Sequence, residues 1–227
     1  MTVQEVVKEL RALSTPEHFA KLSYFGIIDD KALGVKVPLI RQLAKKIGKN
    51  HELALELWET NIHEARILAT FIDDPKKVTE NQFDSWVGDF NSWDICDQCC
   101  GLLIRSPYAL SRIDIYSSAK EEFVKRAAFV LMCALVIYDK KAKDGLFYHF
   151  FTLIEREAWD DRNFVRKAVN WALRQIGKRN ETLRLEAIES AKRIMNQDSK
   201  SARWIATDAL RELRNEKTIA YVNNRKS

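Results

Sequence analysis

The sequence contains few residues that break helices. Of its 227 residues, seven are glycine and four are proline. An all-β fold needs many tight turns, and so few breakers leave little room for them or for a low-complexity linker. No apolar run approaches the roughly 18 residues that a membrane-spanning helix requires. We therefore expect a soluble, largely helical protein that has no membrane partner.

Cysteine and histidine are also scarce, and their spacing does not suggest a metal site. The chain has four cysteines, at positions 96, 99, 100 and 133. Cys96 and Cys99 form a C-x-x-C pair, but no second pair follows at zinc-site spacing, and no βαβ pattern suggests a redox motif. His63-Glu64 begins like the metalloprotease motif H-E-x-x-H, but Ile67 occupies the second histidine position. We expect reduced cysteines that behave as small apolar residues, and no metal or cofactor.

Helical periodicity runs through most of the chain. Apolar residues recur at steps of three and four, and no segment alternates with period two, so we expect about a dozen helices joined by short loops. The predicted helices cover residues 2–13, 16–25, 39–47, 53–58, 61–71, 82–87, 93–104, 118–135, 147–154, 164–174, 181–195 and 201–213, with a short terminal piece after them. We predict a single domain over residues 1–222, followed by a disordered tail at 223–227.

Two helical segments repeat each other. Residues 122–128 and 163–169 both read aromatic–Val–basic–basic–Ala after their first residue, and they lie 41 residues apart. This is the period of HEAT-type repeats, in which helix pairs stack into a solenoid. His63–Arg66 is a candidate start of an earlier, more diverged copy. The predicted fold is all-α, a curved solenoid of HEAT-like helical repeats, with basic helix starts lining a groove that suits a polyanion.

The stretch 91–97 carries the densest set of chemically active side chains. Trp93 and Asp97 are four residues apart, which places them on one helix face, one turn apart. An indole face and a carboxylate can together hold a cation. The alternative is a plain helix start, with Ser92 or Asn91 as N-cap, Asp94 in the first turn and Trp93 in the core.

These motifs resemble the AlkD-like DNA alkylation-repair glycosylases, a family built on HEAT-like repeats. The resemblance runs from about residue 24 to 203. Its landmarks are Tyr24, Gly34-x-x-x-Pro38, Leu57-Trp58, His63–Arg66, Ser92-Trp93-Asp94-x-x-Asp97, Lys125–Ala128 and Lys167-Ala168-x-x-Trp171-x-x-Arg174. The chain departs from the family where Ser92 precedes Trp93, since better-known members have two adjacent tryptophans there. Cys99-Cys100 and Trp204 have no place in the family pattern.

The resemblance implies a role for each matching residue. Asp97 would be the catalytic carboxylate, acting with Trp93, Trp171 and Arg126. The resemblance and the basic residues at the helix starts together predict a set of DNA-binding residues. These are Tyr24, Arg41, Arg66, Lys125, Arg166, Lys167 and Arg174. Structural alternatives are that Trp171 is core, that Tyr24 is structural, and that Arg126 pairs with Glu122.

The implied reaction is hydrolysis of the N-glycosidic bond of cationic alkylpurines, such as N3-methyladenine and N7-methylguanine, in duplex DNA. A cationic purine leaves as a neutral base, so the remaining task is to stabilise an oxocarbenium-like sugar and to position water, which an ionised carboxylate can do. Two alternatives stay open: a non-catalytic binder of damaged or branched DNA, and a HEAT-type protein–protein scaffold. The N-terminal residues 1–5 lack signal-peptide features, and we expect a cytoplasmic, nucleoid-associated monomer.

Overall fold

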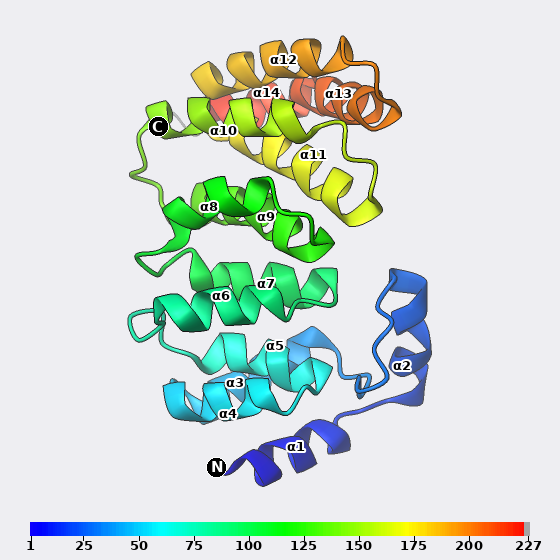
Figure 1. Cartoon of the computed structure of the whole chain (residues 1–227), viewed down its shortest axis with the longest axis vertical. Helices are drawn as coiled ribbons and strands as arrows, with labels where there is room; N and C mark the ends of the chain where they lie inside the picture. The colour runs from blue at the N-terminus through cyan, green and yellow to red at the C-terminus, as the bar shows by residue number, and fades with distance from the viewer. Residues whose placement is uncertain (225–227) are drawn as a thin grey trace. The chain divides into compact units, whose positions relative to one another are not determined.

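The computed structural model describes residues 1–224, and within them it contains only helices and the loops that join them (Figure 1). The helices are α1 (Val3–Ala12), α2 (Pro16–Leu22), the 3-10 helix η1 (Ser23–Phe25), α3 (Val37–Ile47), α4 (His51–Glu59), α5 (His63–Ile72), α6 (Glu80–Gly88), α7 (Trp93–Leu103), α8 (Ala109–Ser117), α9 (Glu122–Tyr138), α10 (Asp144–Glu157), α11 (Asn163–Gly177), α12 (Glu181–Met195), α13 (Lys200–Leu213) and α14 (Glu216–Asn223). The all-α prediction is confirmed.

The chain divides into two compact units, Met1–Tyr108 and Ala109–Ser227. The first contains α1 to α7, and the second contains α8 to α14. A single domain over residues 1–222 stays a prediction. The predicted tail begins inside a helix, because Asn223 is the last residue of α14 and Asn224 caps it. Residues 225–227 of that tail lie outside the described part.

In the first unit, α3, α5 and α7 pack side by side, and α4 packs against α5 (Figure 1). Aromatic residues join α4 to α6. The Trp58 and Trp86 rings stack with centroids 4.0 Å apart and planes within 3°. The Trp58 indole N–H donates a 2.9 Å hydrogen bond to Asp89, just after α6. Burial of apolar rings drives this packing, and the polar edge of Trp58 finds a partner at the surface.

In the second unit, the 41-residue period appears as a structural register. Helix α9 begins at Glu122 and α11 at Asn163, and these two helices pack against each other. The rings of Phe123 and Phe164, the second residues of the two helices, lie 5.4 Å apart. Ser201, at the start of α13, donates a 2.8 Å hydrogen bond to the Asp160 carbonyl, 41 residues earlier. Helices α9 and α11 therefore contact each other through equivalent positions, as HEAT-like repeats do, and the start of α13 contacts the loop before α11.

Two local features differ from the sequence-based expectations. Helix α8, at 109–117, was not predicted, although Ala109, Ile113 and Tyr116 are buried at helical spacing. It directly follows a Ser-Pro break and is interrupted by exposed polar residues, so its pattern is short. The predicted helix 16–25 changes to 3-10 geometry after Leu22 and ends at Gly26, whose φ of +74° suits glycine.

Candidate functional site

Helix α7 exposes one stripe of its surface. Four of its residues are partly exposed, at positions 93, 97, 98 and 101, and the other seven are buried. Trp93 and Asp97 therefore lie one turn apart on the face that reaches solvent. Trp93 is not a plain core residue: its ring packs against the cluster of Leu22, Ile27 and Ala32 and remains partly exposed. Trp93 and Asp97 lie on one face of α7, as their spacing predicts, and their role in a site stays a prediction.

The Trp93 ring is fixed in place by the segment that follows α2. Its indole N–H donates a 2.9 Å hydrogen bond to the Phe25 carbonyl in η1. The ring of the neighbouring Tyr24 meets Phe25 edge-on at 5.4 Å, and Tyr24 is 86% exposed. Tyr24 thus stands in solvent next to the anchor point of Trp93, where a ligand can reach it.

His63 joins this segment to the start of α7, a role that sequence reasoning missed. The imidazole is buried, with Nε2 at 2.8 Å from Asp94 Oδ2 and Nδ1 at 3.5 Å from Asp29 Oδ2. Burial alone would lower the pKa of His63, but the two carboxylates overcome this effect and raise the pKa to about 9. The His63 imidazole beside Asp29 lowers the pKa of this carboxyl to about 2, against the effect of its own burial. The signal in the sequence was a histidine at a helix start with no metal motif to explain it.

The start of α7 has the N-cap residue and the first-turn acid that the plain helix-start alternative expected, Ser92 and Asp94, but neither side chain makes a standard capping bond. Ser92 is the N-cap residue by backbone geometry, but within the described residues its hydroxyl has no hydrogen-bond partner. The carboxylate of Asp94 reaches His63 and the backbone N–H of Ile95. The first turn of α7 is therefore held from the side by His63.

Glu64, beside His63, anchors the loop before α3. Its buried carboxylate accepts hydrogen bonds from the backbone N–H groups of Leu33, Gly34 and Val35, at 2.7, 2.6 and 3.1 Å. A carboxylate that accepts several N–H groups is a strong local anchor. The pair His63-Glu64 thus acts structurally, by holding the loop before α3 and the start of α7.

Of the two arginines predicted to bind DNA in the first unit, Arg41 is exposed and Arg66 is buried. Arg41 donates a 2.7 Å hydrogen bond to Gln98 on α7, next to Asp97, and its guanidinium lies 4.3 Å from the Phe71 ring centroid. Arg66 is 7% exposed, and its N–H groups point to Asn61, Asp89 and the Trp58 carbonyl. Arg66 offers little surface to a phosphate, because its guanidinium is buried and donates its hydrogen bonds to groups of the protein itself.

Arg126 and Glu122 together hold the start of α11. The Arg126 guanidinium donates a 2.8 Å hydrogen bond to the Phe164 carbonyl, and Glu122 accepts one of 3.3 Å from the Phe164 N–H. Arg126 is 6% exposed.

Trp171 lies two turns further along α11 and is partly exposed, so it is not plain core.

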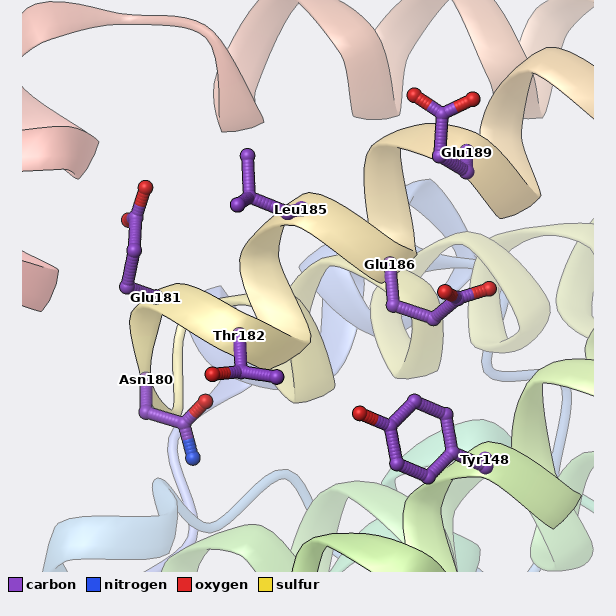
Figure 2. A pocket seen from close by; sticks show the side chains of 7 residues that line it. All are labelled: Tyr148, Asn180, Glu181, Thr182, Leu185, Glu186 and Glu189. Carbon is purple, nitrogen blue, oxygen red and sulfur yellow. The ribbon is translucent and has the colours of Figure 1, made fainter.

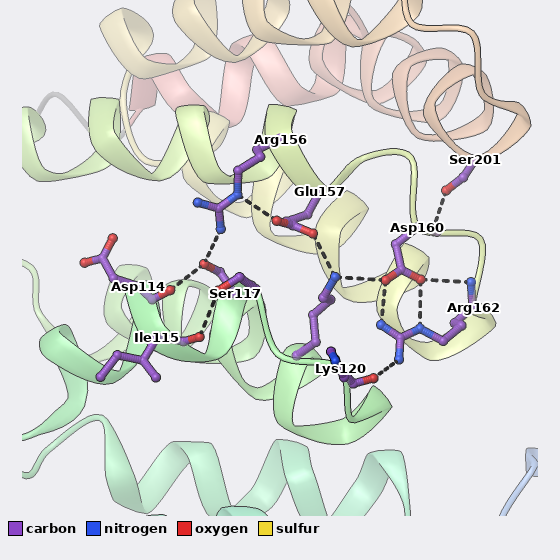
Figure 3. A network of polar contacts seen from close by, with 11 residues as sticks. Asp114, Ile115, Ser117, Lys120, Arg156, Glu157, Asp160, Arg162 and Ser201 are labelled. Atoms are coloured by element: carbon purple, nitrogen blue, oxygen red, sulfur yellow. Dashed lines mark hydrogen bonds and ion pairs between the residues drawn. The ribbon is translucent and has the colours of Figure 1, made fainter.

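A network of charges at the end of α10 includes Glu157 and Asp160 (Figure 3), and these two carboxylates enclose Lys125. Its ammonium lies 2.8 Å from Glu157 and 3.1 Å from Asp160, and all three side chains are buried. Arg156 also contacts Glu157, and Arg162 contacts Asp160. These contacts satisfy the Lys125 charge within the protein, so the predicted DNA contact by Lys125 has little exposed surface behind it.

The remaining basic candidates lie on α11 and differ in their neighbours. Arg166 lies over the Trp204 ring, 4.7 Å from its centroid, and Lys167 is exposed. Arg174 forms ion pairs with Asp208 and Glu212 on α13. Among the described residues, the positive charges of Arg166 and Lys167 near the start of α11 are therefore not neutralised by ion pairs, whereas the charge of Arg174 near its end is neutralised by carboxylates of α13.

A shallow pocket of about 550 Å³ lies between α10 and α12, and none of the predicted site residues lines it (Figure 2). Tyr148 and Leu185 form its apolar part. Its three glutamates, at 181, 186 and 189, are ion-paired with Arg184, Arg193 and Lys192. Nothing in this lining suggests the chemistry of base release.

Among residues 1–224, no group of three or more His, Cys, Asp or Glu side chains gathers in a way that could hold a metal ion. No helix in this range is long and apolar enough to span a membrane. The four cysteines are free thiols and are fully buried with the apolar residues of the core.

The paired helices and their 41-residue register define a HEAT-like repeat protein, and comparison with known proteins gives its family. The model of the DNA alkylation repair enzyme family matches residues 6–213, nearly the whole chain. The chain belongs to this family, which confirms the family resemblance read from its motifs.

Similar proteins extend this comparison. An uncharacterised protein of Listeria innocua, Lin0241, is 33% identical over 89 residues, which span 38% of this chain and 40% of that protein. Lmo0209 of Listeria monocytogenes, also uncharacterised, is 30% identical over 89 residues, which again span 38% of this chain and 40% of that protein. A solved structure is similar with a TM-score of 0.78 and 23% identity, covering 93% of this chain and 95% of the other. It is described as one of a new family of proteins related to the HEAT-like repeat DNA glycosylases, with affinity for branched DNA structures. This similarity confirms the HEAT-like fold.

Proposed function

We propose that this protein is a monofunctional alkylpurine DNA glycosylase, acting as a cytoplasmic, nucleoid-associated monomer on duplex DNA that contains cationic alkylpurines. The observation that carries the proposal is the exposed stripe of α7, on which Trp93 and Asp97 lie one turn apart. Family membership over residues 6–213 supports it.

The stripe suits the chemistry of a cationic leaving group. An N-alkylated purine already carries positive charge, so its departure as a neutral base needs no strong acid. Asp97, when ionised, stabilises the charge that develops on the sugar and orients the attacking water. Trp93 adds an indole face, which attracts a cation by about 0.5–2 kcal/mol depending on desolvation.

Preorganisation of Trp93 is the structural contribution of the surrounding residues. The hydrogen bond to Phe25 and the apolar cluster beneath the ring set its orientation before a ligand arrives. A group that is already oriented loses little entropy when it binds. Arg126 and Trp171, in the second unit, belong to the proposed catalytic set through family resemblance alone.

The test is release of N7-methylguanine and N3-methyladenine from methylated duplex DNA, followed by mass spectrometry. Wild type and Asp97→Asn are compared, because asparagine keeps the shape and removes the charge. Asp198→Asn is the matched control, since Asp198 is fully exposed at the start of α13. We expect release by wild type and by the control, and a loss of at least about 100-fold in Asp97→Asn, typical of removing one transition-state-stabilising group. Equal release by Asp97→Asn would contradict the proposal.

A second candidate is a non-catalytic binder of unusual DNA structures on the same scaffold. Two observations favour it: the similar solved structure described as having affinity for branched DNA, and the use of Arg66, Lys125 and Arg174 in internal contacts. This candidate predicts salt-dependent DNA binding with no base release by wild type. Absence of DNA binding at low salt would instead favour a protein–protein scaffold.

A further inference from the structure

Helices α11 and α13 meet along two facing stripes. Each stripe has three residues one turn apart, and each facing pair is separated by 38 residues in the chain. The pairs are Arg166–Trp204, Asn170–Asp208 and Arg174–Glu212. The helices therefore run side by side in a fixed register, and Trp204 has a definite place in it.

The charge along these stripes is uneven. At the far end, Asp208 and Glu212 neutralise Arg174, and Glu212 also pairs with Lys178. At the near end, Arg166 lies over the uncharged ring of Trp204, and Lys167 beside it is exposed. A ring face attracts a cation without cancelling its charge. The end that contains Trp204 is thus the positive end.

Trp204 takes the position that a cation occupies in the two preceding repeats. Counting from the first residue of each helix, the fifth residue is Arg126 in α9, Lys167 in α11 and Trp204 in α13. The exposed Lys167 at this position can attract a phosphate by charge, whereas an uncharged indole cannot. The planar group that an indole binds in a nucleic acid is a base, and stacking on an aromatic side chain is worth about 1–3 kcal/mol per base.

Trp204 is available for such a contact. Its neighbours Ala202, Ile205 and Ala206 are fully buried, whereas Trp204 is 39% exposed. The Arg166 guanidinium covers one face of the ring, and in the described part of the chain its buried Nε has no hydrogen-bond partner. Ring packing, rather than an ion pair, holds Arg166 here, so its charge is preserved for a ligand.

We propose that Trp204 and Arg166 form a stacking subsite for an unpaired nucleotide. The base stacks on the Trp204 indole, and the phosphate is held by Arg166 and Lys167. The subsite rests on the proposed DNA binding and adds to it a preference for DNA with a single-stranded extension. In a fully paired duplex the bases stack on each other and leave the indole without a ligand.

The test compares two fluorescently labelled DNAs of the same duplex sequence, one blunt and one with a three-nucleotide single-stranded extension, by anisotropy at fixed salt. We expect wild type to bind the extended DNA about 5- to 150-fold more tightly, the range given by stacking of one base. Trp204→Ala should lose this preference while keeping its affinity for blunt duplex. Trp204→Phe should retain part of it, which excludes a folding defect as the cause.

Trp159→Ala is the matched control. Trp159 is also an exposed tryptophan beneath a cation, with Lys125 5.3 Å from its ring centroid, but the Lys125 charge is neutralised. We expect this variant to keep the full preference. Equal binding of both DNAs by wild type, or equal losses in Trp204→Ala and Trp159→Ala, would overturn the subsite. If wild type releases bases but shows no preference, only the subsite fails; if it binds neither DNA, the proposed function fails with it.

Discussion

Lys125 and Arg166 occupy equivalent positions in consecutive repeats, yet only Lys125 is enclosed by carboxylates. Each is the fourth residue of its helix, Lys125 in α9 and Arg166 in α11. Lys125 lies within 3.1 Å of both Glu157 and Asp160, whereas Arg166 lies over the Trp204 ring. The cation at this repeat position thus forms buried ion pairs in one repeat, and in the next repeat its charge is not neutralised by a carboxylate of residues 1–224.

This difference predicts different costs for the same kind of substitution. Lys125→Met leaves two buried carboxylates without their ammonium partner, and breaking a buried pair costs about 3–5 kcal/mol. Arg166→Met, the matched control, removes a cation–π contact worth about 0.5–2 kcal/mol. Urea unfolding of both variants measures the two costs. A Lys125→Met cost no larger than that of Arg166→Met would show that the network in Figure 3 does not stabilise the fold.

His63 predicts how stability depends on pH. Its pKa is about 9 in the folded protein, whereas the ordinary pKa of a histidine is 6.5. The folded state binds this proton more tightly, so the contribution to stability is complete below pH 6.5 and is lost as pH rises through 9. At about 1.4 kcal/mol per pKa unit, the free energy of unfolding should fall by up to about 3 kcal/mol over this interval.

Urea unfolding at pH 6.5, 7.5, 8.5 and 9.5 tests this expectation in wild type, His63→Gln and His149→Gln. His63→Gln should remove most of the decrease. His149 pairs with Asp114 on the surface, with about half of each side chain exposed, so its replacement should leave the decrease intact. A decrease of the same size in His63→Gln would place its origin elsewhere.

Gly34 is predicted to be irreplaceable by alanine. Its φ is +81°, and an added Cβ would lie 2.7 Å from the Phe19 Cβ and 2.8 Å from two Phe19 backbone atoms. Left-handed geometry costs about 1–2 kcal/mol and overpacking about 1–3 kcal/mol, so Gly34→Ala should destabilise by about 2–4 kcal/mol. Gly145→Ala, in α10 with no atom within 4 Å of the new Cβ, should be neutral or stabilising by up to about 1 kcal/mol. Thermal unfolding distinguishes the two variants.

The buried cysteines are predicted to be inert in the folded protein. All four are fully buried, and burial raises the pKa of the Cys99 thiol well above its usual value, with smaller contributions from Cys96 and Asp73. The thiolate is the reactive form, so both access and ionisation disfavour labelling. A maleimide reagent should label no cysteine in the native protein and all four in guanidinium chloride. Rapid native labelling of any of them would contradict this expectation.

Much of the fold was predictable because the repeat leaves a local signature. The segments 122–128 and 163–169 predicted a 41-residue register, and α9 and α11 begin in that register. Helix starts such as Pro16, with Thr15 as N-cap, depend on neighbouring residues and can be read from sequence. Helix α8 escaped prediction because its buried positions are few and its polar residues interrupt the pattern.

The site was less predictable, because burial and partners depend on tertiary packing. The spacing of Trp93 and Asp97 identified one face of α7, but the hydrogen bond from Trp93 to Phe25 joins residues 68 apart. Basic residues that look alike in sequence have opposite surroundings: Arg66 is buried, and Arg41 is exposed. Nothing local distinguishes them, since the acceptors of Arg66 come from α4 and from the residues after α6.

The contact between Trp93 and Phe25 has a consequence for how the chain folds. In the second unit, the bonds from Ser201 to Asp160 and from Asn170 to Asp208 span 41 and 38 residues, so each repeat can order as soon as its neighbour is made. The segment that carries Tyr24 depends on partners 62 and 68 residues later, at Asn91 and Trp93. Because loop closure is slower over longer separations, this segment docks only once α7 has formed. The segment that carries Tyr24 is thus synthesised before α7 but settles after it, and its exposed tyrosine reaches its final position together with Trp93.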